Sequence, residues 1–329
     1  MVADADCDFK RRSVVFPRMT HRTHRIRIWL ILTAIVLGMV AFFEYRAFRF
    51  PPRAATPSTP VFQEEDLLTM HSEAPPAIES PRWERVALAD PHLKDDGLGI
   101  DVEINGRHRF YPYQILAWHE VVNDTFRNKP LLIVYVPLAQ AGFVYERKSD
   151  DTFSASSQIW NSIRFLKDAE SGSLWNPVLA EAAMGARKGE VWTRYPSRVM
   201  TWLSWKNLYR SDEVLARVPD QRRDYTLDPY AHYLDSQEMW FPVEFSDAQL
   251  PVKEPVVGIE VNGQAAAYPL RDLEEGPLQD MVNGVPVSLT VDRLSGAVQA
   301  TSQGKNILTT SIYWFAWVIT HPTTHIYLP

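Results

Sequence analysis

The chain has almost no cysteine: Cys7 is the only one among its 329 residues. This scarcity excludes an intramolecular disulfide, a zinc site built from cysteines and a cysteine nucleophile in the body of the chain. The sequence also has no glycine-rich phosphate loop and no HExxH or GxSxG motif. It therefore gives no support to nucleotide binding, zincin chemistry or serine hydrolysis.

An excess of positive over negative charge occurs only in the first residues of the chain. The formal net charge is -6, and basic side chains are concentrated in residues 1–27, so the rest of the chain is more acidic than the total suggests. This distribution argues against nucleic acid as a partner of the folded part. With 46% hydrophobic and 22% charged residues, the composition is that of a folded protein with one large or two ordinary domains.

One run near the N-terminus, residues 28–43, has no charge at all. It is slightly short for a bilayer core, which needs roughly 17–25 residues, but flanking aromatic residues extend it to residue 48. Basic residues precede the run, so the positive-inside rule places the N-terminus in the cytoplasm. A cleaved signal peptide is the alternative, although no A-x-A site follows directly. A buried core helix fits poorly, because the run is apolar on every face.

We therefore expect a single-pass protein of the cell inner membrane, with a basic cytoplasmic tail over residues 1–27 and a signal-anchor helix in the bilayer over residues 28–48. Residues 49–82 are rich in proline, alanine, serine and threonine. Such a segment is extended and semi-rigid, and it would hold a periplasmic body away from the membrane. We expect the folded part to begin near Trp83.

The body contains an internal repeat. The sequence VEING ending at Gly106 returns as IEVNG ending at Gly263, and both copies continue to a Tyr-Pro pair 157 residues apart. Each copy predicts a β-hairpin with an Asn-Gly turn. The pair Trp202 and Trp205 returns as Trp314 and Trp317 only 112 residues later, so the second copy has lost about 45 residues.

The pattern predicts a β-rich α+β fold with two unequal lobes from a decayed internal duplication, preceded by the transmembrane helix. The first repeat would span residues 83–249 and the shortened second repeat residues 250–329. Strands are expected over residues 131–136, 142–148 and 163–167. Helices are expected over residues 113–122, 199–209 and 314–320, whose apolar spacing suits packing on a sheet.

The densest polar group in an apolar frame is the segment Trp118-His119-Glu120 with Asn123 and Asp124. A neutral His119 could ligate a metal or act as a general base, with Asp124 orienting it. On a helix, however, His119 and Glu120 point about 100° apart and would not face one ion. The alternative is that His119 braces the helix end while Asn123 and Asp124 form the following turn.

The stretches YPYQILAWHEVVND, SSQIWNSIRFLKDAESGSLW and VGIEVNGQAAAYPL resemble the bacterial and archaeal family catalogued as domain of unknown function 3179. The resemblance runs from about Leu98 to the C-terminus. It implies a Cys-Pro-Leu-Cys motif after the strand that follows the Trp-His-Glu segment, but here residues 136–139 read Val-Pro-Leu-Ala. Soft-metal ligation and thiol–disulfide exchange both need these thiols. The chain therefore resembles a divergent member of the family.

The resemblance also extends to other candidate residues. Asn161 matches the family's Tyr-Asn-Ser pattern and could line the same pocket, although a buried asparagine that satisfies strand ends is the alternative. His232 could replace a lost ligand, or could be a histidine of a surface loop. Six tryptophans could form a carbohydrate-stacking cleft or belong to the core: Trp160, Trp175, Trp192, Trp202, Trp205 and Trp240.

Two functions follow from these observations. The favoured one is a membrane-anchored extracytoplasmic binding or scaffold module, with a degenerate active or metal site and a protein partner in the membrane or periplasm. The alternative is a metal-binding protein or acid–base enzyme. Its catalytic residues would be His119, Glu120, Asp124 and Asn161, and His119 would be the ligand of a metal ion.

Overall fold

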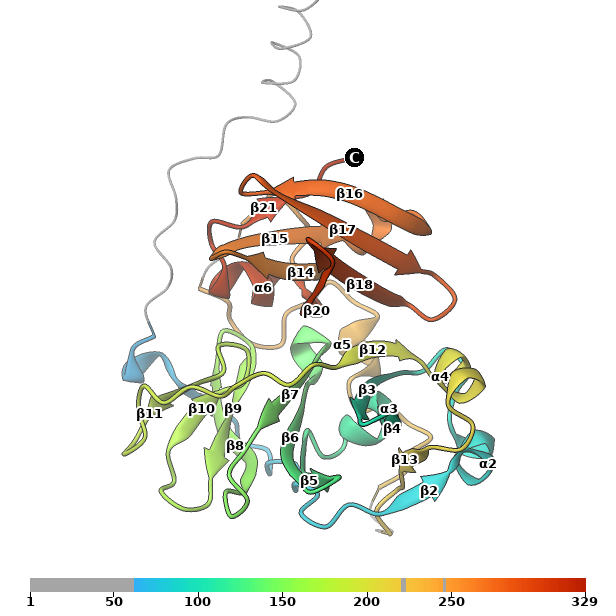
Figure 1. Ribbon diagram of the computed structural model, residues 1–329. Coiled ribbons are helices and arrows are strands. Elements are labelled where there is room, and N and C mark those ends of the chain that lie inside the picture. Colours follow the sequence, from blue (N-terminus) through green and yellow to red (C-terminus); the bar gives the residue numbers. More distant parts are fainter. Residues whose placement is uncertain (1–61, 220–222, 245–246) are drawn as a thin grey trace, which may run out of the picture. The chain divides into compact units, whose positions relative to one another are not determined.

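The computed structural model describes residues 62–219, 223–244 and 247–329 (Figure 1). The predicted basic tail, the predicted membrane anchor and the first part of the linker lie outside these residues. The described residues all belong to one of the two compact units of the chain, residues 57–329. Among them, no helix combines the length and the apolar character needed to cross a membrane.

The described part is β-rich, and its strands form five small sheets. Two of these sheets contain the hairpins of the sequence repeat. The first consists, in pairing order, of β12 (Arg198–Thr201), β3 (Leu98–Ile104), β4 (Arg107–Pro112), β13 (Glu213–Leu215) and β2 (Trp83–Arg85). The second consists of β20 (Thr309–Tyr313), β14 (Pro255–Val261), β15 (Gln264–Pro269) and β21 (His325–Ile326).

The other three sheets complete the body. A three-stranded sheet is formed by β5 (Val121–Phe126), β6 (Lys129–Val136) and β7 (Ala141–Glu146). A four-stranded sheet is formed by β16 (Gly276–Val282), β17 (Val285–Asp292), β18 (Ala297–Ser302) and β19 (Lys305–Ile307). A five-stranded sheet is formed by β1 (Leu68–Thr69), β8 (Phe153–Trp160), β9 (Ile163–Asp168), β10 (Leu174–Asn176) and β11 (Glu181–Met184).

The helices are short. The α-helices are α2 (Val86–Ala89), α3 (Tyr113–Leu116), α4 (Trp202–Leu208), α5 (Ala231–Leu234) and α6 (Trp314–Thr320). The 3-10 turns are η1 (Glu64–Asp66), η2 (Asp90–His92), η3 (Pro137–Ala139) and η4 (Leu270–Asp272).

Both predicted Asn-Gly hairpins are confirmed. In β3–β4 the turn residues Asn105 and Gly106 have φ values of 52° and 71°, and in β14–β15 Asn262 and Gly263 have 49° and 75°. Positive φ at both central residues defines the two-residue turn whose twist matches the flanking strands, and asparagine followed by glycine tolerates it best. The turn chemistry therefore fixes the register of each hairpin.

The pairing of the two hairpin sheets follows the same plan. Asp101 pairs with Phe110 in β3–β4, and Gly258 pairs with Ala267 in β14–β15, at positions 157 residues further along. An antiparallel strand that leads into a Trp-containing helix flanks each hairpin: β12 before α4, and β20 before α6. A short parallel strand lies on the other side, β13 beside β4 and β21 beside β15.

Two predicted helices are wrong in extent. The helix expected over residues 199–209 begins at Trp202, because residues 199–201 belong to β12. The helix expected over residues 113–122 ends at Leu116, and β5 begins at Val121. Between them Glu120 has a left-handed φ of 60°, and its carbonyl accepts from the Tyr135 N–H of β6 at 2.8 Å. Pairing with β6 therefore redirects a chain whose local sequence favours a helix, and the β-branched Val121 and Val122 suit the strand that follows.

The sheet β5–β6–β7 is buried on both faces. Along β6, Leu132 and Val134 belong to one buried cluster, whereas Leu131 and Ile133 belong to another. This alternation is the two-residue period of a strand between two packed layers. By contrast, β16 alternates between covered and exposed residues. The C-terminal end of β6 therefore lies inside the molecule. The candidate site lies beside this end.

Five of the six tryptophans considered above are core residues. Trp160, Trp175, Trp192, Trp202 and Trp205 are at most 8% exposed. Trp240 differs, because it is 41% exposed.

Candidate functional site

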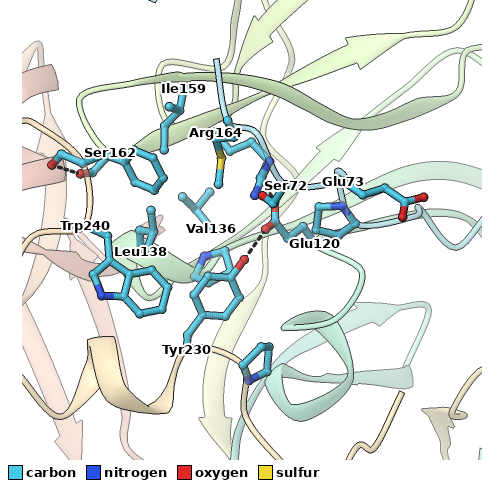
Figure 2. Close-up of a pocket in the computed structure, with 15 residues that line it drawn as sticks. Ser72, Glu73, Glu120, Val136, Leu138, Ile159, Ser162, Arg164, Tyr230 and Trp240 are labelled. Atoms are coloured by element: carbon cyan, nitrogen blue, oxygen red, sulfur yellow. Dashed lines mark hydrogen bonds and ion pairs between the residues drawn. The ribbon is translucent and has the colours of Figure 1, made fainter. Parts of the chain in front are cut away.

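A cavity of about 430 Å³ lies beside the turn that follows β6 (Figure 2). Five parts of the chain line it: Glu120 before β5, the turn at residues 136–138, the β8–β9 hairpin, and two covering segments. We name the first covering segment, residues 70–78, the strap, and the second, residues 228–241, the cap loop. The cavity thus combines a rigid sheet edge with segments that are distant from it in the sequence.

One end of the cavity is polar and contains a buried ion pair. The Arg164 Nε lies 2.9 Å from the Glu120 Oε2, and the Tyr230 hydroxyl donates to the Glu120 Oε1 at 2.8 Å. Glu120 is 2% exposed and Arg164 8%. Burial raises the pKa of Glu120, while the Arg164 charge and the Tyr230 hydrogen bond act in the opposite direction. The two charges depend on each other, because each alone would be costly to bury.

The backbone at Glu120 is strained, and this strain directs its side chain into the cavity. A residue other than glycine at a φ of 60° costs on the order of 1 kcal/mol and persists only where its surroundings fix it. Here the Glu120 N–H donates to the Leu116 carbonyl at 2.6 Å, and the Val121 N–H donates to the His119 carbonyl at 2.7 Å. Such strain gathers at functional sites, so this residue is a strong site candidate.

The other end of the cavity is apolar and aromatic. Trp240 and Phe241 of the cap loop face Leu138 and Ile159, and Figure 2 shows Val136 between this end and Glu120. Hydrogen bonds fix the cap loop to the body: the Tyr233 hydroxyl donates to the Leu138 carbonyl at 2.9 Å, and the Ser162 hydroxyl to the Phe241 carbonyl at 2.8 Å. The aromatic wall is therefore held in place.

His119 is buried next to the cavity but does not line it. Its Nδ1 lies 2.9 Å from the Pro76 carbonyl oxygen, and its Nε2 lies 2.7 Å from the Tyr225 hydroxyl oxygen. Because a carbonyl can only accept, Nδ1 carries the proton, and in a neutral ring Nε2 accepts from Tyr225. A metal would have to displace one of these partners. Among the described residues, no three His, Cys, Asp or Glu side chains are grouped to hold a metal ion.

Asp124 also lies away from the cavity. Its carboxylate accepts from the Tyr111 hydroxyl at 2.7 Å and pairs with Arg109 at 2.8 Å. The neighbouring Asn123 exchanges two hydrogen bonds of 2.9 Å with the backbone of Phe153 and so joins β5 to β8. These contacts support the fold, and they direct the Asp124 carboxylate at Tyr111 and Arg109.

Asn161 occupies the tight turn between β8 and β9, where it and Ser162 have φ values of 49° and 58°. Its Oδ1 accepts from the Glu244 N–H at 2.6 Å, which fixes the chain beyond the cap loop. Its buried Nδ2 has no partner among the described residues. His232 is exposed in α5. Of the four predicted catalytic residues, Glu120 is the one that lines the cavity.

Sequence reasoning missed Arg164, Tyr230 and the two covering segments. Arg164 could have been found, because an arginine between Ile163 and Phe165 in a predicted buried strand needs an anionic partner. No local signal identifies Tyr230, which lies in a loop 110 residues from Glu120. Its place in the site follows from tertiary packing alone.

The model of a family described as "Protein of unknown function (DUF3179)" matches residues 73–311. This range includes the ion pair, the 136–139 turn and the cap loop. Neither the curated proteins nor the solved structures give a match.

Proposed function

The chain belongs to the DUF3179 family, and we propose that it is a binding module whose ligand site is the cavity beside the 136–139 turn. One observation carries this proposal: a buried Glu120–Arg164 pair lies at one end of an otherwise largely apolar cavity of about 430 Å³. Small-molecule sites commonly have this volume, with an apolar lining and a few placed polar groups. Buried charges with a perturbed pKa in a cleft further favour a site.

The 136–139 turn itself supports binding rather than thiol chemistry. The resemblance places the family's two thiols at Val136 and Ala139, at either end of the 3-10 turn η3. Side chains three apart in a 3-10 turn lie on one side, so two cysteines here would be neighbours. In this chain Val136 instead gives the cavity an apolar floor.

An acid–base enzyme is the second candidate, and one observation favours it. Glu120 lines the cavity, and its pKa is raised by burial. Both carboxylate oxygens are already engaged, however, by Arg164 and Tyr230. A general base needs an oxygen within hydrogen-bond reach of the substrate proton, so this role would require Tyr230 or Arg164 to move. Binding needs no such rearrangement.

We also propose that residues 28–48 anchor the module in the inner membrane, with the body on the periplasmic side. The uncharged run of residues 28–43 and the preceding basic tail support this proposal. Residues 49–69 of the proline-rich linker would then join the anchor to the strap, which lies within the same predicted segment. A module held near the membrane could also act as a scaffold for a membrane or periplasmic protein, as predicted from the sequence.

We further infer that the two hairpin sheets arose by duplication. Their common strand order and their equivalent registers, 157 residues apart, support this origin. The boundary predicted between residues 249 and 250 follows from the same proposal. Residues of β8–β11 lie in the first copy, in the stretch that the second copy lacks.

The binding function can be tested with a fragment library and the full chain in detergent micelles, by saturation-transfer NMR. Ser72 lines the cavity and is exposed, so Ser72→Trp should obstruct it without disturbing the core. Ser80→Trp is the matched control, because Ser80 is exposed but lies outside the lining. We expect fragments that bind the wild type and Ser80→Trp but not Ser72→Trp. If no fragment distinguishes the two variants, the proposal is wrong.

A further inference from the structure

We infer that the cavity selects small organic cations, namely protonated amines with an apolar or aromatic body. This inference rests on the proposed binding function and specifies its ligand class. Its evidence is the charge of the lining, the engagement of Arg164, the remaining lone pair of the Tyr230 hydroxyl and the aromatic wall.

The lining has an excess of negative charge. Its ionisable carboxylates and cations are Glu73, Glu120 and Arg164, that is, two acids and one base. Arg164 is matched by Glu120 at 2.9 Å, so the exposed Glu73 gives the surplus charge. In Figure 2, Glu73 lies on the same side of the cavity as Glu120 and Arg164. A cation entering this end would therefore meet a field that attracts it, whereas an anion would be repelled.

The covering segments reinforce this field. The strap, residues 70–78, and the cap loop, residues 228–241, contain no lysine or arginine. The cap loop has instead three acidic residues, Asp228, Asp235 and Glu238. Behind the cap loop, the Lys253 ammonium is directed at the Tyr233 and Ser236 carbonyls, at 2.5 and 2.9 Å. Arg223 does not line the cavity, but it lines a neighbouring hollow that shares Glu73 and Tyr230 with it. Neither covering segment therefore has a lysine or arginine that would repel a cationic ligand.

Arg164 is poorly placed to clamp an anionic ligand. Its Nε is directed at Glu120, and its Nη1 donates to the Ser156 carbonyl at 2.9 Å. Bidentate recognition of a carboxylate needs two neighbouring N–H groups that point the same way, and the Nε and Nη1 donors are already committed to protein acceptors. Arg164 therefore serves to hold Glu120 in its charged form. The other groups of the lining determine whether the cavity prefers a cationic or an anionic ligand.

The Tyr230 hydroxyl offers an acceptor at the polar end. Its proton is donated to Glu120 at 2.8 Å and its oxygen also accepts from Arg164, which leaves one lone pair for a donor from a ligand. An ammonium group has three donors and no acceptor, so it complements this remaining lone pair, while the nearby Glu120 carboxylate offsets the Arg164 charge. A carboxylate ligand would bring only acceptors to a place where acceptors already prevail.

Aromatic rings complete the site. Tyr230 and Trp240 have ring centroids 6.0 Å apart, and Trp240 is 41% exposed. The faces of tryptophan and tyrosine attract ammonium groups, and the effect grows as water is excluded. Beyond the rings, Leu138 and Ile159 provide an apolar surface for the body of the ligand. The cavity therefore fits an amine attached to a compact apolar group.

The test uses three probes of one skeleton: benzylamine, benzoate and benzyl alcohol. Their dissociation constants for the full chain in non-ionic detergent are measured by titration calorimetry at neutral pH, with Ser72→Trp as the correction for micelle partitioning. We expect benzylammonium to bind at least about tenfold more tightly than benzoate, with benzyl alcohol between them. In Glu73→Gln, an exposed position that does not threaten folding, benzylamine should weaken about threefold and benzyl alcohol should not change.

The outcomes separate the two proposals. If benzoate binds as tightly as benzylamine, or more tightly, and its binding is lost in Ser72→Trp, the cation selectivity is wrong while the binding function stands. If benzyl alcohol alone binds in a Ser72-dependent way, the same conclusion holds. If no probe and no library fragment shows binding that Ser72→Trp removes, the binding function itself is contradicted, and the ligand class falls with it.

Discussion

At the scale of single residues, the Glu120 carboxylate lies between the Arg164 guanidinium and the Tyr230 hydroxyl, in a place almost closed to solvent. A paired buried charge is weak evidence for stability, because a well-packed apolar pair often does as well. We therefore attribute the buried Glu120–Arg164 pair, and the strained backbone at Glu120, to ligand binding rather than to stability. The same geometry predicts how substitutions at this position behave.

Glu120→Ala should destabilise the protein by about 3–5 kcal/mol, because it leaves the Arg164 charge buried without a partner. Glu120→Gln should cost clearly less, since the amide oxygen can still accept from Arg164 and the Tyr230 hydroxyl can turn to accept from the amide nitrogen. Urea unfolding followed by near-ultraviolet circular dichroism measures both. Equal destabilisation by the two variants would contradict this account, because it would show that the lost negative charge alone matters and that the hydrogen bonds kept by glutamine do not.

The raised pKa of Glu120 predicts a pH dependence of cation binding. As the pH falls through this pKa, Glu120 takes up a proton, the negative charge facing the ligand decreases, and benzylamine affinity should fall. Arg164 and Tyr230 face this carboxylate, and Glu73 lies on the same side of the cavity. Because burial raises the pKa of Glu120, the change should begin above the ordinary glutamate value of 4.5. Titration calorimetry of benzylamine, repeated at pH values above and below this value, measures the change in affinity.

Glu120→Gln is the control, and the part of the change that starts above the ordinary value should be absent from it. The sign for stability is separate. Because burial raises the folded-state pKa of Glu120 above its unfolded value, the protonated form favours folding. That contribution is fully present below the unfolded pKa and is lost as the pH rises through the folded pKa. Affinity that rises on acidification would contradict the assignment.

At the scale of elements, the strap is the segment whose attachment decides whether the cavity exists. At one end the Met70 N–H donates to the Ser157 carbonyl at 2.8 Å, and at the other the Ile78 backbone bonds to Val121 and Asn123 at 2.9 Å. Between these points the His119 ring holds the Pro76 carbonyl. Residues 71–75 are thus fixed from both sides while they cover the site.

His119→Ala should loosen the strap and lower the free energy of unfolding by about 1–3 kcal/mol, the usual cost of leaving a buried polar group unsatisfied. Metal content, measured by mass spectrometry on protein without a histidine tag, should be the same as in the wild type. His232→Ala, at an exposed position, is the control and should leave stability unchanged within about 0.5 kcal/mol. A near-stoichiometric metal that disappears in His119→Ala would instead establish a metal site.

The hairpin sheets predict a difference between two glycines of the same hairpin. A Cβ at Gly258 would lie 2.2 Å from the ring of the buried Trp317, whose Nε1 is fixed by Thr324 at 3.0 Å. Gly258→Ala should therefore cost more than the roughly 1–3 kcal/mol of ordinary overpacking. Gly263→Ala, which meets open space and only strains a φ of 75°, should cost about 1 kcal/mol. Thermal unfolding of the two variants measures the contrast.

The elements also show which parts of the structure a sequence can predict. The Asn-Gly hairpins were predictable because a two-residue turn with positive φ nearly dictates its residues. The helix expected over residues 113–122 failed because a hydrogen bond from Tyr135 to Glu120, across the sheet, overrides local preference. The cavity could not be predicted, since Tyr230 and Trp240 reach Glu120 only through the packing of the cap loop. Glu120 itself was predicted as a site residue, together with His119, Asp124 and Asn161, but its partners Arg164 and Tyr230 were not.

At the scale of the whole molecule, the proposed anchor makes a prediction about location. The full chain should remain in the membrane fraction after carbonate extraction, because an apolar helix over residues 28–48 is held by the bilayer core. A variant without residues 28–48 should be extracted. In spheroplasts, protease added outside should digest the body while leaving an N-terminal tag protected. Protection of the body in intact spheroplasts would reverse the predicted orientation.

The account depends most directly on where a ligand binds, and methyl NMR of the full chain can locate it. The methyl groups of Met70 and Ile159 line the cavity, whereas Ile259 lies in a separate buried cluster under β14. Addition of benzylamine, or of the best fragment from the library, should shift the Met70 and Ile159 signals and leave Ile259 unchanged. Saturable binding that moves Ile259, or that leaves both cavity methyls unmoved, would contradict the central claim.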